Sequence, residues 1–242
     1  MENNKSKLRC VAISDIHGYL ENPRNMPEGD VLCICGDIVP LEFQVDTVRS
    51  ISWFCLEFVP WVESLPYKKV LLIAGNHDFF LEEIGKSGHG EYVRQRLLPG
   101  RMALKCPKLV YLCDDPVTVD GKKFYGTPWI ADLSGWAFYL PESELVKKWE
   151  KIPDCDVILT HMPPKVGNIG RVLQSGKYCS NQDFGSESLA ETLKTRKFQY
   201  VLSGHIHSGA HHPVSLGVGK AVNVSIKDED YNVFYYPLEV DI

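Results

Sequence analysis

Short, unbroken apolar runs are the feature of this sequence that most restricts its fold. Three of them occur early in the chain, at residues 8–14, 31–35 and 69–74, and they are rich in Val, Ile and Leu. A strand with one solvated face alternates apolar and polar residues, whereas an unbroken apolar run is typical of a strand buried on both faces. We therefore expect a largely parallel sheet that is covered on both sides.

Helices are expected on the outside of the sheets. Apolar residues recur at helical spacing over residues 45–65, where Asp46 is a suitable N-cap and Pro60 is expected to kink or end the helix. Residues 142–150 and a segment that opens at Ser188 form two more helices. Further strands are expected at residues 110–112, 117–119, 122–125, 156–160, 199–203, 220–226 and 231–236. The pattern predicts a single α/β domain over residues 1–242, with two packed sheets between outer helices.

Composition and charge exclude several classes of protein. The 242 residues are 44% hydrophobic and 24% charged, which is typical of a folded domain and not of a disordered or fibrous chain. With 26 Lys and Arg against 31 Asp and Glu, we expect no extended nucleic-acid surface. No apolar stretch approaches the roughly 18 residues that span a bilayer, and no signal peptide is recognisable, so we expect a cytoplasmic protein without membrane contact. The oligomeric state is not indicated.

Polar side chains with metal-binding or catalytic chemistry directly follow five of the predicted strands. They are Asp15 and His17, then Asp37, then Asn76 and His77, then His161, and finally His205 and His207. In open α/β sheets, ligand sites gather beyond the carboxyl ends of the strands. One such group alone would be an ordinary turn or cap, but five in succession indicate one shared site.

The residue types indicate a site for two divalent metal ions. Imidazole and carboxylate together bind Mn, Fe, Zn, Co or Ni, and no single strand end provides enough ligands for one ion. Asp15 and His17 alternate in an extended segment, so both can reach the same ion. The carboxylate of Asp37 can bridge two ions through its two oxygens, and Asn76 adds a neutral amide oxygen.

These groups resemble the motifs of the calcineurin-like metallophosphoesterases: Asp-x-His, Gly-Asp, Gly-Asn-His-Asp/Glu, His and Gly-His-x-His. All five are present, in this order, between Asp15 and His207. The resemblance implies the metallophosphoesterase fold, a four-layer α-β-β-α sandwich of two mixed sheets. It implies a first metal held by Asp15, His17, Asp37 and His207, and a second held by Asp37, Asn76, His161 and His205.

The chemistry implied by the resemblance is hydrolysis of a phosphoric ester. Two metals roughly 3.5–4 Å apart lower the pKa of a bridging water and hold the phosphoryl oxygens. The metal-bridging hydroxide would be the nucleophile, with Asp37 as the shared ligand and Mn as the favoured metal. His77 would lie beside the phosphate and donate a hydrogen bond or a proton, so Asp37 and His77 are the expected catalytic residues.

One motif departs from the pattern of the protein Ser/Thr phosphatases, which is Gly-Asp-x-x-Asp-Arg-Gly. Here Gly36 and Asp37 are followed by Ile-Val-Pro-Leu-Glu. The second Asp, which supports the family His, and the phosphate-binding Arg are both missing. This weakens the interpretation as a phosphoprotein phosphatase, and it leaves open which group orients His77.

Residues 111–115, 125–129, 135–138 and 159–164 resemble the metallophosphodiesterase-domain group, which includes animal brain proteins and many bacterial relatives. This resemblance implies small or nucleotide-like phosphodiester substrates, with cyclic nucleotides among the candidates. Trp129 and Trp136 either stack on the substrate or pack the core. A phosphomonoesterase acting on nucleotides or small metabolites shares every motif and stays an alternative. A catalytically idle binding scaffold ranks lower, because His77 and all ligand positions are retained.

Overall fold

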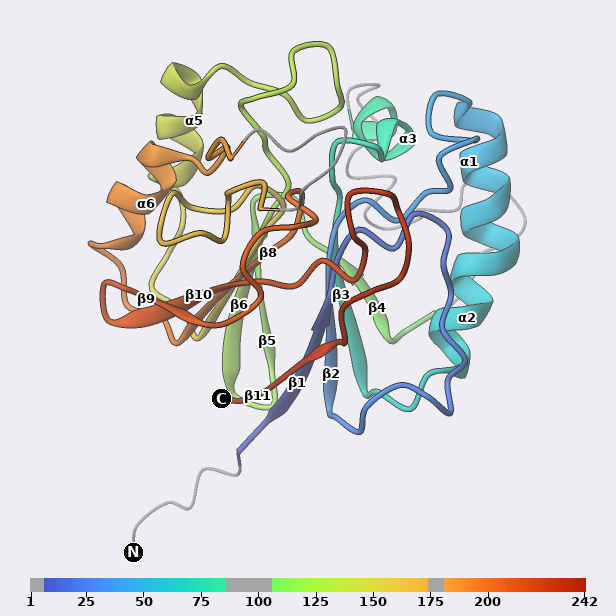
Figure 1. Cartoon of the computed structure of the whole chain (residues 1–242). Helices are drawn as coiled ribbons and strands as arrows, with labels where there is room; N and C mark the ends of the chain where they lie inside the picture. The colour runs from blue at the N-terminus through green and yellow to red at the C-terminus, as the bar shows by residue number, and fades with distance from the viewer. Residues whose placement is uncertain (1–6, 86–105, 174–180) are drawn as a thin grey trace, which may run out of the picture.

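The computed structural model describes residues 7–85, 106–173 and 181–242, which form two β-sheets between outer helices (Figure 1). The first sheet has the order β11-β1-β2-β3-β4. Its strands are β1 (Arg9–Ile13), β2 (Val31–Cys35), β3 (Lys69–Ile73), β4 (Leu109–Tyr111) and β11 (Leu238–Asp241). Strands β1 to β4 are parallel, and β11 pairs with β1 in the antiparallel direction. The three early apolar runs therefore form the centre of this sheet.

The second sheet has the order β5-β6-β7-β8-β10-β9. Its strands are β5 (Asp115–Val119), β6 (Lys122–Thr127), β7 (Val157–Thr160), β8 (Tyr200–Ser203), β9 (Val214–Leu216) and β10 (Gly219–Asn223). Strands β6, β7, β8 and β10 are parallel, and the hairpins β5–β6 and β9–β10 add antiparallel edges. The β5–β6 turn places Asp120 at φ 47° and Gly121 at φ 81°, as a tight hairpin requires. Both sheets are thus mixed.

Helices cover the outer face of each sheet (Figure 1). On the first sheet lie α1 (Thr47–Trp53), η1 (Phe54–Phe58) and α2 (Val59–Ser64), and on the second lie α5 (Glu142–Trp149) and α6 (Glu187–Leu193). A short helix, α3 (Phe79–Ile84), follows β3. The four-layer α-β-β-α sandwich predicted for the chain is confirmed. No helix in the described ranges is long and apolar enough to cross a bilayer.

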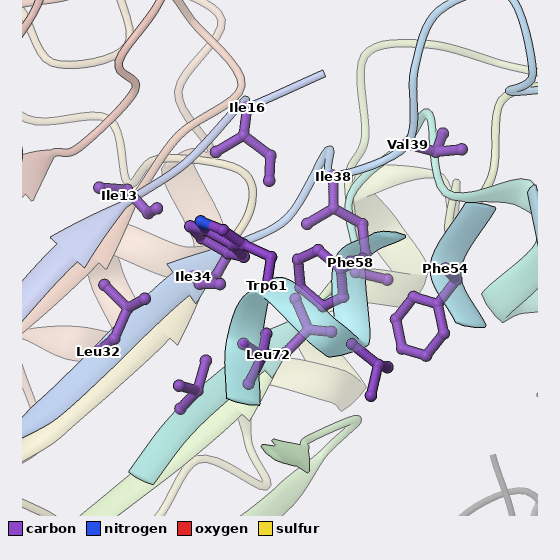
Figure 2. Close-up of a cluster of buried hydrophobic side chains, with 14 of the residues drawn as sticks. Ile13, Ile16, Leu32, Ile34, Ile38, Val39, Phe54, Phe58, Trp61 and Leu72 are labelled. Atoms are coloured by element: carbon purple, nitrogen blue, oxygen red, sulfur yellow. The ribbon is translucent and has the colours of Figure 1, made fainter. Parts of the chain in front are cut away.

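The buried apolar side chains form three layers, because successive side chains of the central strands point to opposite faces of each sheet. Ile13 of β1 packs with Trp61 of α2 in the cluster between the first sheet and its helices (Figure 2). Its neighbour Ala12 faces the other way, into the cluster between the two sheets, because successive side chains of a strand point to opposite faces. A third cluster, around Trp149, lies between the second sheet and its helices. Because both faces of the central strands are buried, polar and apolar residues do not alternate along them.

The helical segment continues through Pro60 to Ser64, so Pro60 does not end the helix. The preceding residues Phe54–Phe58 are π-helical, and Pro60 stands in the first turn of α2. The backbone N–H of Val59 donates to the carbonyl of Phe54, five residues back. This wider turn accommodates a residue that has no N–H and whose ring needs space. Asp46 caps α1 as predicted, with its side chain accepting from the Arg49 N–H at 3.0 Å.

Two predictions in the C-terminal third of the chain were wrong. Residues 231–236 do not form a strand, and the strand that follows β10 is β11 (Leu238–Asp241), which pairs with β1. The carboxylate of Asp228 accepts from the Asn232 N–H at 2.9 Å and closes a turn instead. Helix α6 is capped by Ser186, whose hydroxyl accepts from the Leu189 N–H at 3.1 Å, so it begins earlier than Ser188.

Candidate metal centre

All of the predicted ligands lie at one end of the two sheets, in the loops that follow the strands. Asp15 and His17 follow β1, Asp37 follows β2, Asn76 and His77 follow β3, His161 follows β7, and His205 and His207 follow β8. The His17 N–H donates to the Asp37 carbonyl at 3.0 Å. The His205 N–H lies 3.1 Å from both carboxylate oxygens of Asp15 and so joins the two sheets.

Several predicted ligands hold backbone conformations that side chains rarely adopt. The φ angle is 56° at Asp15, 42° at His17, 54° at Asp37 and 71° at His205. Each such residue costs on the order of 1–3 kcal/mol, although Asp and His tolerate this region better than most residues. Strain of this kind clusters at functional sites, so the backbone independently supports a site at this end of the sheets.

Asp15, His17 and His207 form the first ligand group. One ligand atom from each lies within 4.8 Å of the others, and Asp15 Oδ1 is 3.6 Å from His207 Nε2. The His17 ring is buried, and neither of its nitrogens has a hydrogen-bond partner among the described residues. Because a buried polar group without a partner is costly, a cation that takes the His17 lone pair fits this position.

Asn76, His161 and His205 form the second ligand group together with Asp37. Asn76 Oδ1 lies 2.9 Å from His161 Nε2 and 2.8 Å from His205 Nδ1. Asp37 Oδ2 is 3.3 Å from the same nitrogen of His161. An amide oxygen, two imidazole nitrogens and a carboxylate oxygen therefore converge, and this donor set suits a divalent transition metal.

Asp37 stands between the two groups. Its Oδ1 accepts a hydrogen bond from the His77 N–H at 2.8 Å. Its Oδ2 lies 3.9 Å from His17 Nε2 and 3.3 Å from His161 Nε2. Oδ2 therefore lies within 4 Å of a histidine of each group.

Two glycines leave the space that the carboxylates occupy. A Cβ on Gly75 would lie 2.2 Å from Asp37 Oδ1, and a Cβ on Gly204 would lie 2.3 Å from Asp15 Oδ2. No real Cβ atom makes contacts this short. Each of these two glycines thus lets the backbone pass directly behind a predicted ligand of another motif.

The charges of the centre favour a cation between its carboxylates. Burial lowers the pKa of His17 to about 3, so its ring is neutral at pH 7 and offers a lone pair. Burial also acts to lower the pKa of His161, but the carboxylates of Asp37 and Asp15 outweigh it and raise that pKa to about 10. The carboxylates thus hold a positive charge at His161, and a divalent cation would displace this proton when it binds.

His77 is held by a residue that no motif contains. Its Nδ1 hydrogen-bonds with the side-chain oxygen of Gln44, and its Nε2 lies 3.8 Å from Asp37 Oδ2. Burial lowers the pKa of His77, while Asp37 acts in the opposite direction. Gln44 is therefore a group that can orient the His77 ring, which the sequence left open.

Asp78 binds backbone and not a ligand side chain. Its carboxylate accepts from the N–H groups of Asp37 at 2.9 Å, Ile38 at 3.0 Å, Val39 at 3.1 Å and Gly75 at 2.8 Å. The last residue of the Gly-Asn-His-Asp motif thus fixes the loops after β2 and β3 relative to each other.

Another carboxylate reaches the centre from the loop between β6 and α5. The oxygens of Asp132 lie 2.9 Å and 3.0 Å from Nε2 of His205. Sequence reasoning missed Asp132 because it belongs to none of the five motifs and is 73 residues from its partner. An acidic residue in a polar loop carries no signal that distinguishes it from a solvated one.

The two tryptophans singled out from the sequence differ in their surroundings. Trp129 Nε1–H donates to Asp114 Oδ1 at 2.9 Å, and Lys148 Nζ lies 3.7 Å from the Trp129 ring centre. Trp129 is thus a packing residue. The Trp136 ring centre lies 4.6 Å from that of His77, so Trp136 borders the candidate catalytic histidine.

Comparisons with known proteins agree with this geometry. The model of a family described as "Calcineurin-like phosphoesterase" matches residues 8–209. The human "Metallophosphoesterase domain-containing protein 1" is 30% identical over 97% of this chain and 71% of its own length. A UPF0046 protein of Caenorhabditis elegans is 30% identical over 98% of this chain and 82% of its own length.

A solved structure shares the fold at low sequence identity. The phosphopantetheinyl hydrolase from Mycobacterium tuberculosis superposes with a TM-score of 0.55 and 13% identity, and the match covers 98% of this chain and 96% of the hydrolase. At this identity the likeness concerns the fold alone.

Proposed function

Because this chain belongs to the calcineurin-like phosphoesterase family, we propose that it hydrolyses small or nucleotide-like phosphodiesters with two divalent cations. The observation that carries the proposal is the convergence of two ligand groups on one carboxylate oxygen, Asp37 Oδ2. A single cation would leave one of these groups unused.

We assign the ligands to the two cations as the family motifs imply. One cation would be held by Asp15, His17, Asp37 and His207, and the other by Asp37, Asn76, His161 and His205. Mn²⁺ is the first metal to test, followed by Fe, Zn, Co and Ni, because the mixed nitrogen and oxygen donors suit all of them.

Bound cations would supply Lewis acidity, which neutralises phosphoryl charge and lowers the pKa of a water molecule. The chain's own residues position the ester and manage protons. Gln44 accepts a hydrogen bond from the Nδ1–H of His77, so Nε2 is the ring nitrogen that faces the centre. In the imidazolium form, Nε2–H can donate to a phosphoryl oxygen or to the leaving oxygen. Asp78 keeps the loops of Asp37 and His77 in register during turnover.

The second motif favours a diester over a monoester. Leu41 stands where the protein phosphatases carry a phosphate-binding Arg. A monoester is a dianion near neutral pH and gains most from a bidentate Arg, whereas a diester carries a single negative charge. The substrate would be a small molecule, with cyclic nucleotides among the candidates, and neither a nucleic acid surface nor a membrane is proposed as a partner.

Metal-stripped protein reconstituted with Mn²⁺ tests this proposal. We expect a higher kcat/KM for bis-p-nitrophenyl phosphate than for p-nitrophenyl phosphate, followed by activity on a panel of cyclic nucleotides. A preference for the monoester would favour the alternative, a phosphomonoesterase. Failure to bind any divalent cation, together with no hydrolysis, would favour an idle scaffold of the same fold. An Asp37→Asn variant purified in parallel measures contaminating activity.

Replacing Gln44 with Ala is expected to lower kcat on the diester about tenfold, which is a part of the full contribution of a general acid. The His77 ring would lose the contact that fixes its Nδ1–H, while the metal ligands stay untouched. Steady-state kinetics and metal analysis check this, with KM and metal content unchanged.

Two matched variants control the Gln44 experiment. Gln44→Glu keeps an oxygen acceptor and should retain most of kcat. Glu42→Ala changes an exposed side chain of the same loop and should have no effect. An unchanged kcat in Gln44→Ala would show that other contacts orient His77.

A further inference from the structure

Two histidines of the centre, His161 and His207, share one arrangement of their ring nitrogens. His161 Nδ1–H donates to the carbonyl of Cys35 at 2.8 Å, and His207 Nδ1–H donates to the carbonyl of Asp228 at 2.9 Å. A carbonyl only accepts, so Nδ1 carries a proton and Nε2 is the nitrogen that can bind a cation. In both cases the partner is backbone, which no side-chain substitution removes.

His205 has the opposite orientation and a different partner. Its Nδ1 is the nitrogen that faces Asn76 Oδ1, at 2.8 Å, so Nδ1 must be the bare nitrogen if His205 is to bind the second cation. Its Nε2 lies 2.9 Å and 3.0 Å from the two oxygens of Asp132. Both side chains are almost enclosed, with 4% of His205 and 16% of Asp132 exposed.

We propose that Asp132 is a positioning residue that accepts the Nε2–H of His205 and thereby keeps Nδ1 free to bind the second cation. A carboxylate has no proton to donate in its ionised form, so it admits only the tautomer with the proton on Nε2. The part of this inference that concerns cation binding rests on the proposed function.

Backbone hydrogen bonds hold the loop that carries Asp132 close to the metal centre. The Leu140 N–H donates to the Ile130 carbonyl at 3.0 Å, which closes the loop on itself. The Ala137 N–H donates to the Asn76 carbonyl at 3.3 Å, which ties the loop to a ligand of the same cation. A buried carboxylate needs a hydrogen-bond donor, and His205 provides it here.

Asp132→Ala tests the proposal by removing the acceptor of the His205 Nε2–H. Asn76 Oδ1 would then be the remaining hydrogen-bond acceptor beside the ring, so the ring proton would move to Nδ1 and block the ligand atom. Titrating metal-stripped protein with Mn²⁺ in a calorimeter should show two sites in the wild type. In the variant, the affinity of the second site should fall about 10- to 100-fold, and the first should be unchanged.

Two further variants separate positioning from folding. Asp132→Glu keeps a carboxylate acceptor and should restore much of the second site. Asp120→Asn makes the same charge change in the exposed β5–β6 turn, where Asn tolerates φ 47°, and should bind both ions as the wild type does. Circular dichroism confirms that each variant is folded.

The tautomer can be read without any metal. A long-range ¹H–¹⁵N correlation spectrum of the metal-free protein, assigned with a His205→Gln variant, should show a proton on Nε2 of His205, and Asp132→Ala should shift it to Nδ1, which faces Asn76 Oδ1. Retention of the Nε2 proton or an unchanged second site in Asp132→Ala would overturn the inference. If the wild type binds fewer than two ions, the proposed function fails, but the spectrum still decides the role of Asp132.

Discussion

Asp37→Asn is expected to lower kcat/KM by at least about a thousandfold, equivalent to about 4 kcal/mol of transition-state stabilisation. Oδ2 of Asp37 lies within 4 Å of a histidine of each group, so this substitution weakens both cation sites together. Asn keeps an Oδ1 that accepts from the His77 N–H, so the loop geometry is preserved. Metal analysis of the purified variant should show less than one ion per chain, and steady-state kinetics should show the loss of turnover.

Asp46→Asn is the matched control for this experiment. It makes the same change of charge at the N-cap of α1, where Asn and Asp cap equally well, so activity and metal content should be retained. Two bound ions and wild-type turnover in Asp37→Asn would show that the cations do not share this carboxylate.

His77→Ala is expected to lower kcat by about 10²- to 10⁴-fold while both cations stay bound. His77 contacts Asp37 through its backbone N–H, which Ala retains, and only its ring faces the centre. The loss should be smaller for a p-nitrophenyl leaving group, which departs without a proton, than for an alkyl leaving group, which needs one. Kinetics on an aryl and an alkyl diester, together with metal analysis, check both points.

The outcome for His77→Ala separates two roles. An equal loss on the aryl and alkyl diesters would indicate that His77 binds the phosphoryl group and does not protonate the leaving oxygen. Loss of the metals would instead place His77 among the ligands. Wild-type turnover would remove it from the mechanism.

The centre of the fold could be predicted because burial on both faces leaves a strong pattern. The run at residues 31–35 matches β2 (Val31–Cys35) at both ends, since each of these side chains is buried. Peripheral elements depend on contacts that no local pattern encodes. Residues 231–236 have strand-like composition, but Lys227 Nζ donates to the Tyr231 carbonyl at 2.9 Å and stabilises a turn. Strand β9 (Val214–Leu216) has only three residues, too few to show a period.

The candidate site also contains residues that could be predicted from the sequence and residues that could not. The predicted ligands follow buried strands, so strand position alone brings Asp15, Asp37 and His161 to one end of the sheets. Gln44 and Asp132 could not be predicted, because each lies in a loop whose path is set by tertiary contacts. Their residue types are common in solvated loops, and only the folded chain shows that each meets a ring nitrogen of the centre.

Four predicted ligands, Asp15, His17, Asp37 and His205, have a left-handed backbone conformation, which lowers the stability of the folded chain. Glycine adopts these angles without strain, so a chain selected only for stability would drift toward glycine at these positions and lose its ligands. The three apolar layers of the sandwich therefore have to offset the free energy that the strained ligand loops cost. Engineering for heat resistance should accordingly strengthen these layers and leave the strained residues unchanged.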